Sequence, residues 1–567
     1  MMIQHHFTSG ESPIAYSPER GFGFVDGTEK EKFASLQIPE TNSGFLTKWW
    51  YGNEKMTEVT ADARGCGWSA SQEVLREDMN QRNVPLCFRQ DLEFEGTYQL
   101  KLTLYSEYGA QKVLVFAGRR RLIWMGDLTS KETITISATC DVSPIIPRGK
   151  SEPYSDPALS VAVLCTRGKV FVQTIEIAPM ESKRIFIMGD STVTDQTGDF
   201  PYAPGSCYCG WGQMLGMFVD GDLCVSNHAH SGLTTESFRT EGHWDVMKPL
   251  LKEGDFCLLQ FGHNDQKLSH LQAFGGYSER LEEYVRELRA LNVTPVLVTP
   301  LARNSWNSDG TYNDLLEAYA NAVIQLGERL HVPVIDLHAY SMKWIKQVGL
   351  ESAKELFYPG DYTHTNDFGA YAMAEYVGRQ FCGIFGKMFR QSEPWKPYPP
   401  FAALDAPLIC KQKAPIGKKQ PWEKLEEERS DELLTRVECL EVVIEMMKLF
   451  PINVYNDLFE DVLGHETYAG AVQCAVQNHL VPGQMVSDGK LYPNQPITLE
   501  EFFAILMPAY KSRRQLEEKT QVLPQYPTNY PETTSWAINA GFAAKDADWS
   551  ETLSRRQAAK ICKNVRI

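Results

Sequence analysis

A serine, an aspartate and a histidine lie in short motifs that could together perform nucleophilic catalysis. Ser191 belongs to Gly189-Asp-Ser-Thr, directly after an apolar run, while Asp361 and His364 belong to Asp-Tyr-Thr-His. A serine hydroxyl is a poor nucleophile at neutral pH and needs a base, which a histidine supplies when a carboxylate orients its ring. Each motif alone has a simpler explanation, since Ser191 could be only the N-cap of a helix. The case for catalysis therefore depends on the motifs nearby.

Two further motifs offer hydrogen-bond donors for a negatively charged oxygen. Gly232 ends the stretch Ser226-Asn-His-Ala-His-Ser-Gly, where a glycine lets backbone N–H groups approach a reacting oxygen, although a plain turn also favours glycine. Asn264 follows Gly262-His and could donate its side-chain N–H to the same oxygen as the amides of Ser191 and Gly232. Three such donors would form an oxyanion hole, in which one lost donor costs about 3 kcal/mol.

The elements that must position these residues follow the pattern of a parallel α/β sheet. Short apolar runs alternate with longer helical stretches, the runs being 184–188, 222–226, 255–261, 294–299 and 332–336. Helical spacing is plain in 278–288. Five strands linked by helices predict a doubly wound parallel sheet, which binds ligands beyond the carboxyl ends of its strands. His263 and Arg303 follow the third and fourth strands, so each is either a substrate-pocket residue or a structural hydrogen-bonding residue.

The segments on either side have different patterns. Up to about residue 180, alternating runs predict a β-sandwich, the runs being 97–105, 113–117, 133–138, 159–165 and 170–177. Residues 391–430 are rich in proline and then in charge, which indicates a linker. Capping-box patterns recur at 435–438, 498–501 and 554–557, each opening an amphipathic helix of a helix-loop-helix unit. We therefore expect four parts: 1–180, 181–390, 391–430 and 431–567.

Composition excludes several function classes. The formal charge of −16 repels nucleic acid and anionic membrane surfaces, and no apolar run approaches the ~20 residues of a membrane-spanning helix. Thirteen cysteines without paired spacing suit reduced thiols, so neither disulfides nor a metal site is expected. The N-terminus has no basic start followed by an apolar core. The chain as given is thus expected in the cytoplasm, whereas removal of a leader would place it at the cell surface.

Taken together, the motifs of the middle segment resemble those of the SGNH (GDSL-like) hydrolases and, within them, the rhamnogalacturonan acetylesterases. The resemblance covers 183–388 and rests on Gly189-Asp-Ser191, Asn227-x-Ala-x-x-Gly232 with Ser237-Phe238, Phe261-Gly-His-Asn-Asp265 and Asp361-x-x-His364. It implies a flavodoxin-like α/β/α fold with Ser191 as nucleophile, His364 as base and Asp361 as its partner. It also implies an oxyanion hole formed by the Ser191 and Gly232 amides with Asn264. The chain departs from the acetylesterases at Gly232-Leu-Thr, where they often carry Gly-Arg-Ser.

The flanking segments carry resemblances of their own. Residues 1–180, through the stretch 16–24, look like the galactose-binding-like β-sandwich that accompanies some of these esterases. The C-terminal repeats look like S-layer homology units, in which a Thr-Arg-x-Glu motif helps to bind cell-wall polysaccharide. The stretch 435–438 keeps this motif, whereas 498–501 lacks the arginine and 554–557 lacks the glutamate. Contact with wall polysaccharide and self-association are both open roles for the repeats.

These observations predict a serine esterase that removes acetyl groups from pectin-derived sugars, rhamnogalacturonan fragments above all. The partner is then an acetylated oligo- or polysaccharide, and the chemistry needs no metal or organic cofactor. One alternative is an esterase or lipase acting on another acylated sugar or a small lipid. Another is a non-catalytic cell-wall carbohydrate-binding protein. The intact set of Ser191, Asp361 and His364 argues against the latter.

Overall fold

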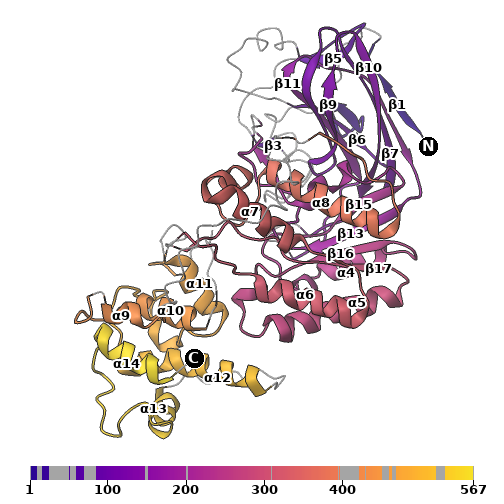
Figure 1. Cartoon of the computed structure of the whole chain (residues 1–567). Coiled ribbons are helices and arrows are strands. Elements are labelled where there is room, and N and C mark those ends of the chain that lie inside the picture. The colour runs from indigo at the N-terminus through magenta and orange to yellow at the C-terminus, as the bar shows by residue number, and fades with distance from the viewer. Residues whose placement is uncertain are drawn as a thin grey trace. The chain divides into compact units, whose positions relative to one another are not determined.

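The computed structural model divides the chain into two compact units (Figure 1). Unit 1 comprises Met1–Phe261 and Arg280–Ile409, and unit 2 comprises Gly262–Glu279 and Cys410–Ile567. The residues described are 2–8, 16–24, 50–51, 59–68, 85–146, 151–199, 202, 204–307, 310–393, 395, 420–427, 429–447, 449, 459–462, 468–518 and 530–565. Most of the linker expected at 391–430 lies outside them, and the four-part division remains a prediction.

The N-terminal part of unit 1 contains two antiparallel sheets. In the first, β10 (Glu132–Val142), β7 (Gly96–Ser106), β12 (Phe171–Pro179), β5 (Gly65–Trp68) and β4 (Val59–Asp62) follow one another, and β1 (Ile3–His6) also pairs with β12. In the second, the order is β2 (Phe22–Phe24), β6 (Leu86–Asp91), β11 (Ala158–Gly168), β8 (Ala110–Ala117) and β9 (Arg121–Leu128). Leu102 and Leu104 of one sheet share a core with Val113 and Val115 of the other, so the sheets pack face to face.

The third sheet of unit 1 is parallel and five-stranded, as predicted. Its order is β15 (Leu223–Asn227), β13 (Lys183–Gly189), β16 (Phe256–Gln260), β17 (Thr294–Val298) and β18 (Val334–Ile335). The order 2-1-3-4-5 is that of flavodoxin-like sheets. The buried runs of β15 and β16 show why the sequence has apolar blocks here and not an alternating pattern, since helices cover both faces.

Helices flank this parallel sheet on both sides, with α7 and α8 on one side and α5 and α6 on the other (Figure 1). The helices are α2 (Trp211–Met214), α3 (Ser237–Thr240), α4 (His243–Met247), α5 (Ser278–Ala290), α6 (Glu317–Leu330), α7 (Leu337–Ala353) and α8 (Asp367–Phe385), with 3₁₀ turns η2 (Leu215–Met217), η3 (Lys248–Leu250) and η6 (Lys354–Leu356). Helix α8 begins where the Asn366 side chain accepts a hydrogen bond from the Gly369 N–H, and it ends at Gly386 with φ 60°. A short pair, β3 (Trp50–Tyr51) with β14 (Gly198–Asp199), completes the unit.

The antiparallel sheets and the parallel sheet share a hydrophobic core. Leu114 and Phe116 of β8 belong to the same buried cluster as Ile187 of β13 and Trp211 of α2. Strand β8 is therefore buried on both faces at its end. This common core explains why the described residues of the predicted domains 1–180 and 181–390, apart from 262–279, form a single compact unit.

The described residues of unit 2 outside 262–279 are mainly helical. Its helices are α9 (Glu423–Glu427), α10 (Arg436–Met446), α11 (Ala469–Gln477), α12 (Leu499–Glu518), α13 (Tyr530–Asn539) and α14 (Arg555–Val565), with the short η8 (Gly483–Met485). All three predicted capping boxes form: the side chains of 435 and 438, of 498 and 501, and of 554 and 557 bond to each other's backbone N–H. The repeats thus begin their helices in the same way.

The residues just before these caps form a closed ring of backbone hydrogen bonds. Leu434 donates to Leu553, Leu553 donates to Ile497, and Ile497 donates back to Leu434, over 2.8, 3.1 and 2.9 Å. Each repeat therefore contacts both others at the same position. The three repeats consequently form one helical body around a common centre.

Residues 262–279 belong to unit 2 because they pack on helix α11. The Asn478 side chain accepts from the Ser269 N–H at 2.7 Å and donates to the Lys267 carbonyl. This stretch includes η4 (Asp265–Lys267) and the π-turn η5 (Ala273–Tyr277). It also carries the third predicted motif, with His263 and Asn264.

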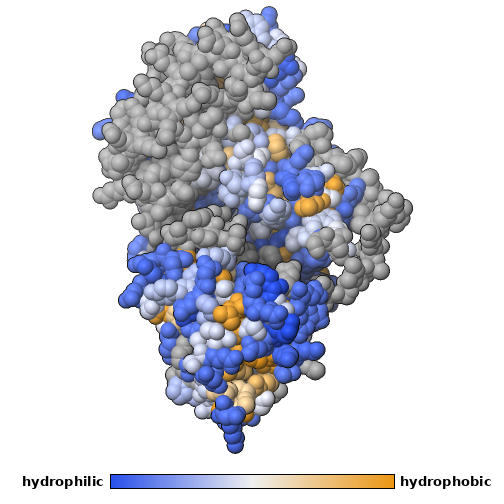
Figure 2. Space-filling model, turned by 90° about the vertical axis from the view of Figure 1, so that its left-hand side faces the viewer, coloured by the Kyte–Doolittle hydropathy of each residue, from blue (hydrophilic) through white to orange (hydrophobic). Residues whose placement is uncertain are grey.

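The described surface is mostly hydrophilic on the face shown in Figure 2, with hydrophobic residues in small groups. Among the described residues, no helix is both long and apolar enough to span a bilayer.

Candidate active site

Ser191, His364 and Asp361 form a continuous hydrogen-bonded series in unit 1. Ser191 Oγ lies 2.7 Å from His364 Nε2, and His364 Nδ1 lies 2.7 Å from Asp361 Oδ2. This is the geometry in which a ring nitrogen can accept the serine proton while a carboxylate fixes the opposite nitrogen. The sequence motifs, separated by about 170 residues, are thus brought together as predicted.

The Asp361 carboxylate is held as an anion by the loop that carries it. Its Oδ1 accepts from the N–H groups of Thr363 at 2.7 Å and His364 at 3.0 Å. Burial alone would raise the pKa of Asp361, but the His364 ring and these N–H groups outweigh burial and lower it. A charged carboxylate is what stabilises an imidazolium during proton transfer.

A tight turn after β13 lifts Ser191 out of the sheet. The Asp190 carboxylate accepts from the Thr192 N–H and hydroxyl at 2.9 and 2.8 Å, which fixes the turn from inside. Gly189 is required by close packing, since a Cβ there would lie 2.7 Å from the Gln260 carbonyl oxygen of β16. Glycine therefore lets the serine loop start directly above the neighbouring strand.

Two tyrosines that the sequence did not single out hold the His364 ring. The Tyr208 ring meets the His364 ring edge-on with centroids 5.6 Å apart, and it stacks on Tyr358 at 3.6 Å. The Tyr358 N–H also donates to the His364 carbonyl. The sequence gives no signal for this role. Tyr208 lies far from His364 along the chain, and Tyr358 has no motif around it.

The Gly232 motif is attached to the Ser191 motif by several hydrogen bonds. The Asn227 side chain donates to the Val193 carbonyl and to Asp195, and the His230 N–H donates to the Gly189 carbonyl. Gly232 itself has φ +90°, a conformation that favours glycine, and open space where a Cβ would be. This geometry suits a backbone N–H that must be approached closely, and the oxyanion role of Gly232 remains a prediction.

Asn264 and His263 are both buried. The Lys267 ammonium donates to Asn264 Oδ1, so a donor role for this side chain falls to its amide nitrogen. The His263 carbonyl accepts from the Gln266 side chain at 3.3 Å. The oxyanion role of Asn264 and the substrate role of His263 remain predictions.

Arg303 lies behind the loop that carries His364. Its Nη1 donates to the Thr363 hydroxyl at 2.5 Å, and burial lowers its pKa to about 10 despite the nearby carboxylates of Asp190 and Asp361. The contact with Thr363 favours the structural alternative for Arg303. Its predicted role in the substrate pocket remains a prediction.

Within the ranges that the structure describes, no three His, Cys, Asp or Glu side chains are grouped as metal ligands would be. The cysteines of these ranges are free thiols, most of them buried.

A parallel flavodoxin-like sheet with a serine, histidine and aspartate beyond its strand ends defines a serine hydrolase of the SGNH class. Residues 187–371 match the GDSL-like lipase/acylhydrolase family. The rhamnogalacturonan acetylesterase RhgT of Bacillus subtilis is 33% identical over 208 residues, 34% of this chain and 87% of that protein. The chain belongs to the GDSL-like lipase/acylhydrolase family and is a carboxylic ester hydrolase.

A second relative matches a larger share of the chain. The uncharacterized esterase YxiM of Bacillus subtilis is 27% identical over 385 residues, 66% of this chain and 94% of that protein. The crystal structure of YxiM covers 68% of this chain and 99% of its own, at 23% identity and a TM-score of 0.35.

Proposed function

We propose that this protein is a carbohydrate esterase that removes acetyl groups from pectin-derived sugars, with acetylated rhamnogalacturonan fragments as the main substrate. The observation that carries the proposal is the series Asp361–His364–Ser191, with both hydrogen bonds at 2.7 Å. The similarity to RhgT, which is named a rhamnogalacturonan acetylesterase, supports the choice of substrate. The Gly232-Leu-Thr stretch, which departs from the acetylesterase pattern, leaves the exact sugar to experiment.

In the first half-reaction the serine attacks the acetyl carbonyl. His364 Nε2 accepts the proton of Ser191 Oγ as Oγ bonds to the carbonyl carbon, and Asp361 stabilises the imidazolium. The amides of Ser191 and Gly232 and the side chain of Asn264 donate to the oxyanion. The tetrahedral intermediate then expels the sugar hydroxyl oxygen, which takes the proton from His364.

In the second half-reaction water releases the acetyl group. His364 accepts a proton from the water molecule as its oxygen attacks the acetyl carbonyl. The Ser191 Oγ bond breaks, and His364 returns the proton to Ser191. The products are acetate and the deacetylated sugar, and the enzyme is regenerated.

The test is acetate release from acetylated rhamnogalacturonan oligosaccharides, with acetylated xylan and 4-nitrophenyl acetate in parallel. We expect the highest kcat/KM on the rhamnogalacturonan substrate and no release by Ser191→Ala. Faster release from xylan would contradict the substrate. Hydrolysis of 4-nitrophenyl acetate without release from any acetylated sugar would contradict a carbohydrate esterase altogether.

A further inference from the structure

We propose that three consecutive arginines at the turn between β8 and β9 position the catalytic loops of the hydrolase. This arginine turn consists of Arg119, Arg120 and Arg121, which belong to the antiparallel sheets. Their side chains donate to the loops that carry Ser191, Gly232 and His364. The inference deepens the proposed function, because positioning matters only if those loops perform the chemistry.

Arg120 connects the turn to the loop and helix after His364. Its side chain is completely buried and pairs with Asp367, the first residue of α8 and only three positions after His364. Its Nη2 also donates at 2.6 Å to the carbonyl of Tyr208, whose ring contacts His364. Displacement of Arg120 would therefore act on the His364 ring through both Asp367 and Tyr208.

Arg119 and Arg121 connect the turn to the two loops expected to form the oxyanion hole. Both pair with the buried Asp195, at 3.1 and 2.8 Å, four residues after Ser191. The other Asp195 oxygen accepts from Asn227, at the start of the Gly232 motif, and Arg119 also donates to the Asn227 carbonyl. One carboxylate thus joins the turn to the loops of Ser191 and Gly232.

Two glutamines complete these connections. The Gln196 carbonyl accepts from Arg120 Nε at 3.1 Å, and the Gln196 side chain donates to the carbonyl of Ser191 and to the hydroxyl of Ser231. The Gln213 side chain donates to the carbonyls of Arg119 and Gln196, both at 2.9 Å. The contacts therefore reach the backbone of Ser191 and the residue next to Gly232.

The turn is built at an energetic cost, which argues for a role beyond packing. Arg120 has φ 53°, a backbone conformation that is unfavourable for a residue with a Cβ. Burial of three neighbouring cations also costs desolvation free energy, and apolar side chains at these positions would not have this cost. Burial alone would lower the pKa of Arg120, but Asp367 outweighs burial and raises it, so Arg120 keeps its charge.

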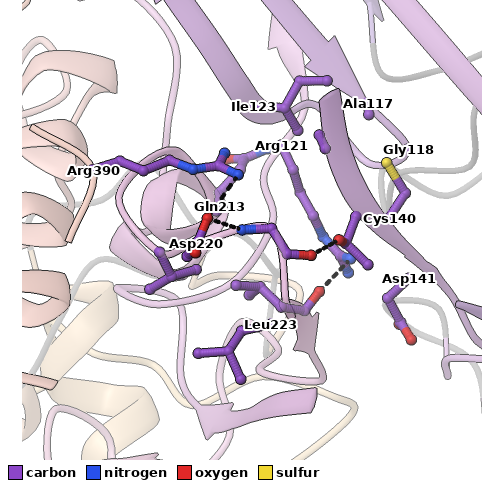
Figure 3. A pocket seen from close by; sticks show the side chains of 17 residues that line it. Ala117, Gly118, Arg121, Ile123, Cys140, Asp141, Gln213, Asp220, Leu223 and Arg390 are labelled. Carbon is purple, nitrogen blue, oxygen red and sulfur yellow. Dashed lines mark hydrogen bonds and ion pairs between the residues drawn. The ribbon is translucent and has the colours of Figure 1, made fainter. Parts of the chain in front are cut away.

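A narrow pocket beside the turn shows how closely the two parts of unit 1 meet (Figure 3). Arg121, Cys140 and Asp141 face Gln213 and Asp220 across it. The cavity volume there is about 30 Å³, which leaves room for little more than a water molecule or two. The pocket is too small for a sugar, so the arginine turn meets the hydrolase part by direct contact.

The experiment measures kcat, KM and the unfolding midpoint of the full-length protein with 4-nitrophenyl acetate as substrate. The main variant is the double change Arg120→Met with Asp367→Asn, which removes both charges. The asparagine side-chain oxygen can still accept the hydrogen bond that the Tyr202 hydroxyl donates to Asp367. We expect kcat to fall about 100-fold, because misplaced catalytic groups lose rate at unchanged KM. The midpoint should stay close to that of the wild type.

The matched control is Arg89→Met. Arg89 is also buried in the antiparallel sheets, but it pairs with Asp91 and Asp156, both outside the hydrolase part. This change should lower the midpoint and leave kcat unchanged. Wild-type kcat in the double variant, or an equal loss of kcat in Arg89→Met, would overturn the proposal.

The rate of Ser191 labelling by a fluorophosphonate serves as a second readout, which should fall in the double variant and not in Arg89→Met. Because the fluorophosphonate reacts with Ser191 itself, this readout does not depend on which sugar is the substrate. If the wild type is labelled and cleaves 4-nitrophenyl acetate but no acetylated sugar, the substrate proposal fails while the arginine turn is still tested.

Discussion

Arg436 of the first C-terminal repeat forms a buried ion pair with Glu501, the capping glutamate of the second repeat. Arg555 of the third repeat pairs in the same way with Glu438 of the first, at 2.5 Å. The remaining junction, from the second repeat to the third, has Leu499 and Gln557 at the corresponding positions. The arginine and glutamate of the Thr-Arg-x-Glu pattern therefore join two of the three junctions between repeats, and both departures from the pattern fall at the third.

Arg436→Met should destabilise unit 2, because it leaves the buried Glu501 without its partner. We expect a loss of about 3 to 5 kcal/mol, which is typical when one member of a buried pair is removed. The measurement is the calorimetric transition of unit 2 in the full-length protein. The control is Lys424→Ala, which breaks the exposed pair with Glu445 and should cost below about 1 kcal/mol. Equal effects of the two changes would show that the Arg436–Glu501 pair does not hold the repeats together.

Asp361→Asn should lower kcat by about 10⁴-fold, because the amide favours the wrong tautomer of His364. The structure also predicts how the stability contributed by Asp361 depends on pH. The pKa of Asp361 is lowered below its ordinary 3.8, so the stability from its charged form is present above that value. It is lost only as the pH falls through the still lower folded-state pKa. The Asp361 carboxylate should therefore be charged at both pH 5 and pH 7 in the wild type. The measurements are the rate and the free energy of urea unfolding at these two pH values, where the stability contributed by this charge should be fully present.

A matched control for Asp361→Asn is Asp314→Asn. Asp314 also pairs with a histidine, since its Oδ1 lies 2.9 Å from His338 Nε2. Because this pair does not contact Ser191, its loss should reduce stability and leave kcat in place. A large loss of kcat in Asp314→Asn would mean that either change acts through folding.

His243 should make the protein less stable at acid pH. It lies on α4 beside Arg119, His228 and His230, and burial lowers its pKa to about 4. The unfolded chain then binds more protons than the folded chain between pH 4 and 6.5, so stability falls as the pH falls through this window. The shift corresponds to about 3 kcal/mol. The pKa of His228 is also lowered by burial, which adds to the trend.

The measurement for His243 is urea unfolding at several pH values between 4 and 7. His243→Gln should flatten the dependence on pH. Val246→Ala, on the same helix and beside the same pocket, should lower stability by the same amount at every pH. If His243→Gln keeps the wild-type slope, His243 does not contribute to it.

The sequence pointed to Ser191, Gly232 and Asn264 as candidates because each lies shortly after a predicted strand. Once the apolar runs before Ser191, Gly232 and Asn264 are recognised as parallel strands, sheet geometry brings their ends to one edge. His364 does not follow a strand directly, since α7 and η6 separate it from β18, and the Asp361-x-x-His364 motif pointed to it instead. The five strands of the parallel sheet lie where the apolar runs predicted them, although β18 is shorter than its run.

The supporting contacts had no such signal. Arg119 lies in a polar turn 76 residues before its partner Asp195, and arginines in a turn ordinarily indicate solvent exposure. Residues 262–279 interrupt the α/β pattern without a change in composition, so their packing on Asn478 could not be foreseen. Contacts between distant segments depend on the fold, which local patterns do not encode.

Gly232→Ala should lower kcat by about 100-fold, the loss expected when one oxyanion donor is displaced. A Cβ would meet no atom within 4 Å at this position, so the effect should come from the φ of +90° and not from a clash. The alanine would draw the backbone away from this angle and turn the N–H with it. The control is Gly310→Ala, with φ +82° and equally open space in a loop after β17. Measured kcat on 4-nitrophenyl acetate should fall only in the first variant, and similar activity of both would contradict a donor role for the Gly232 amide.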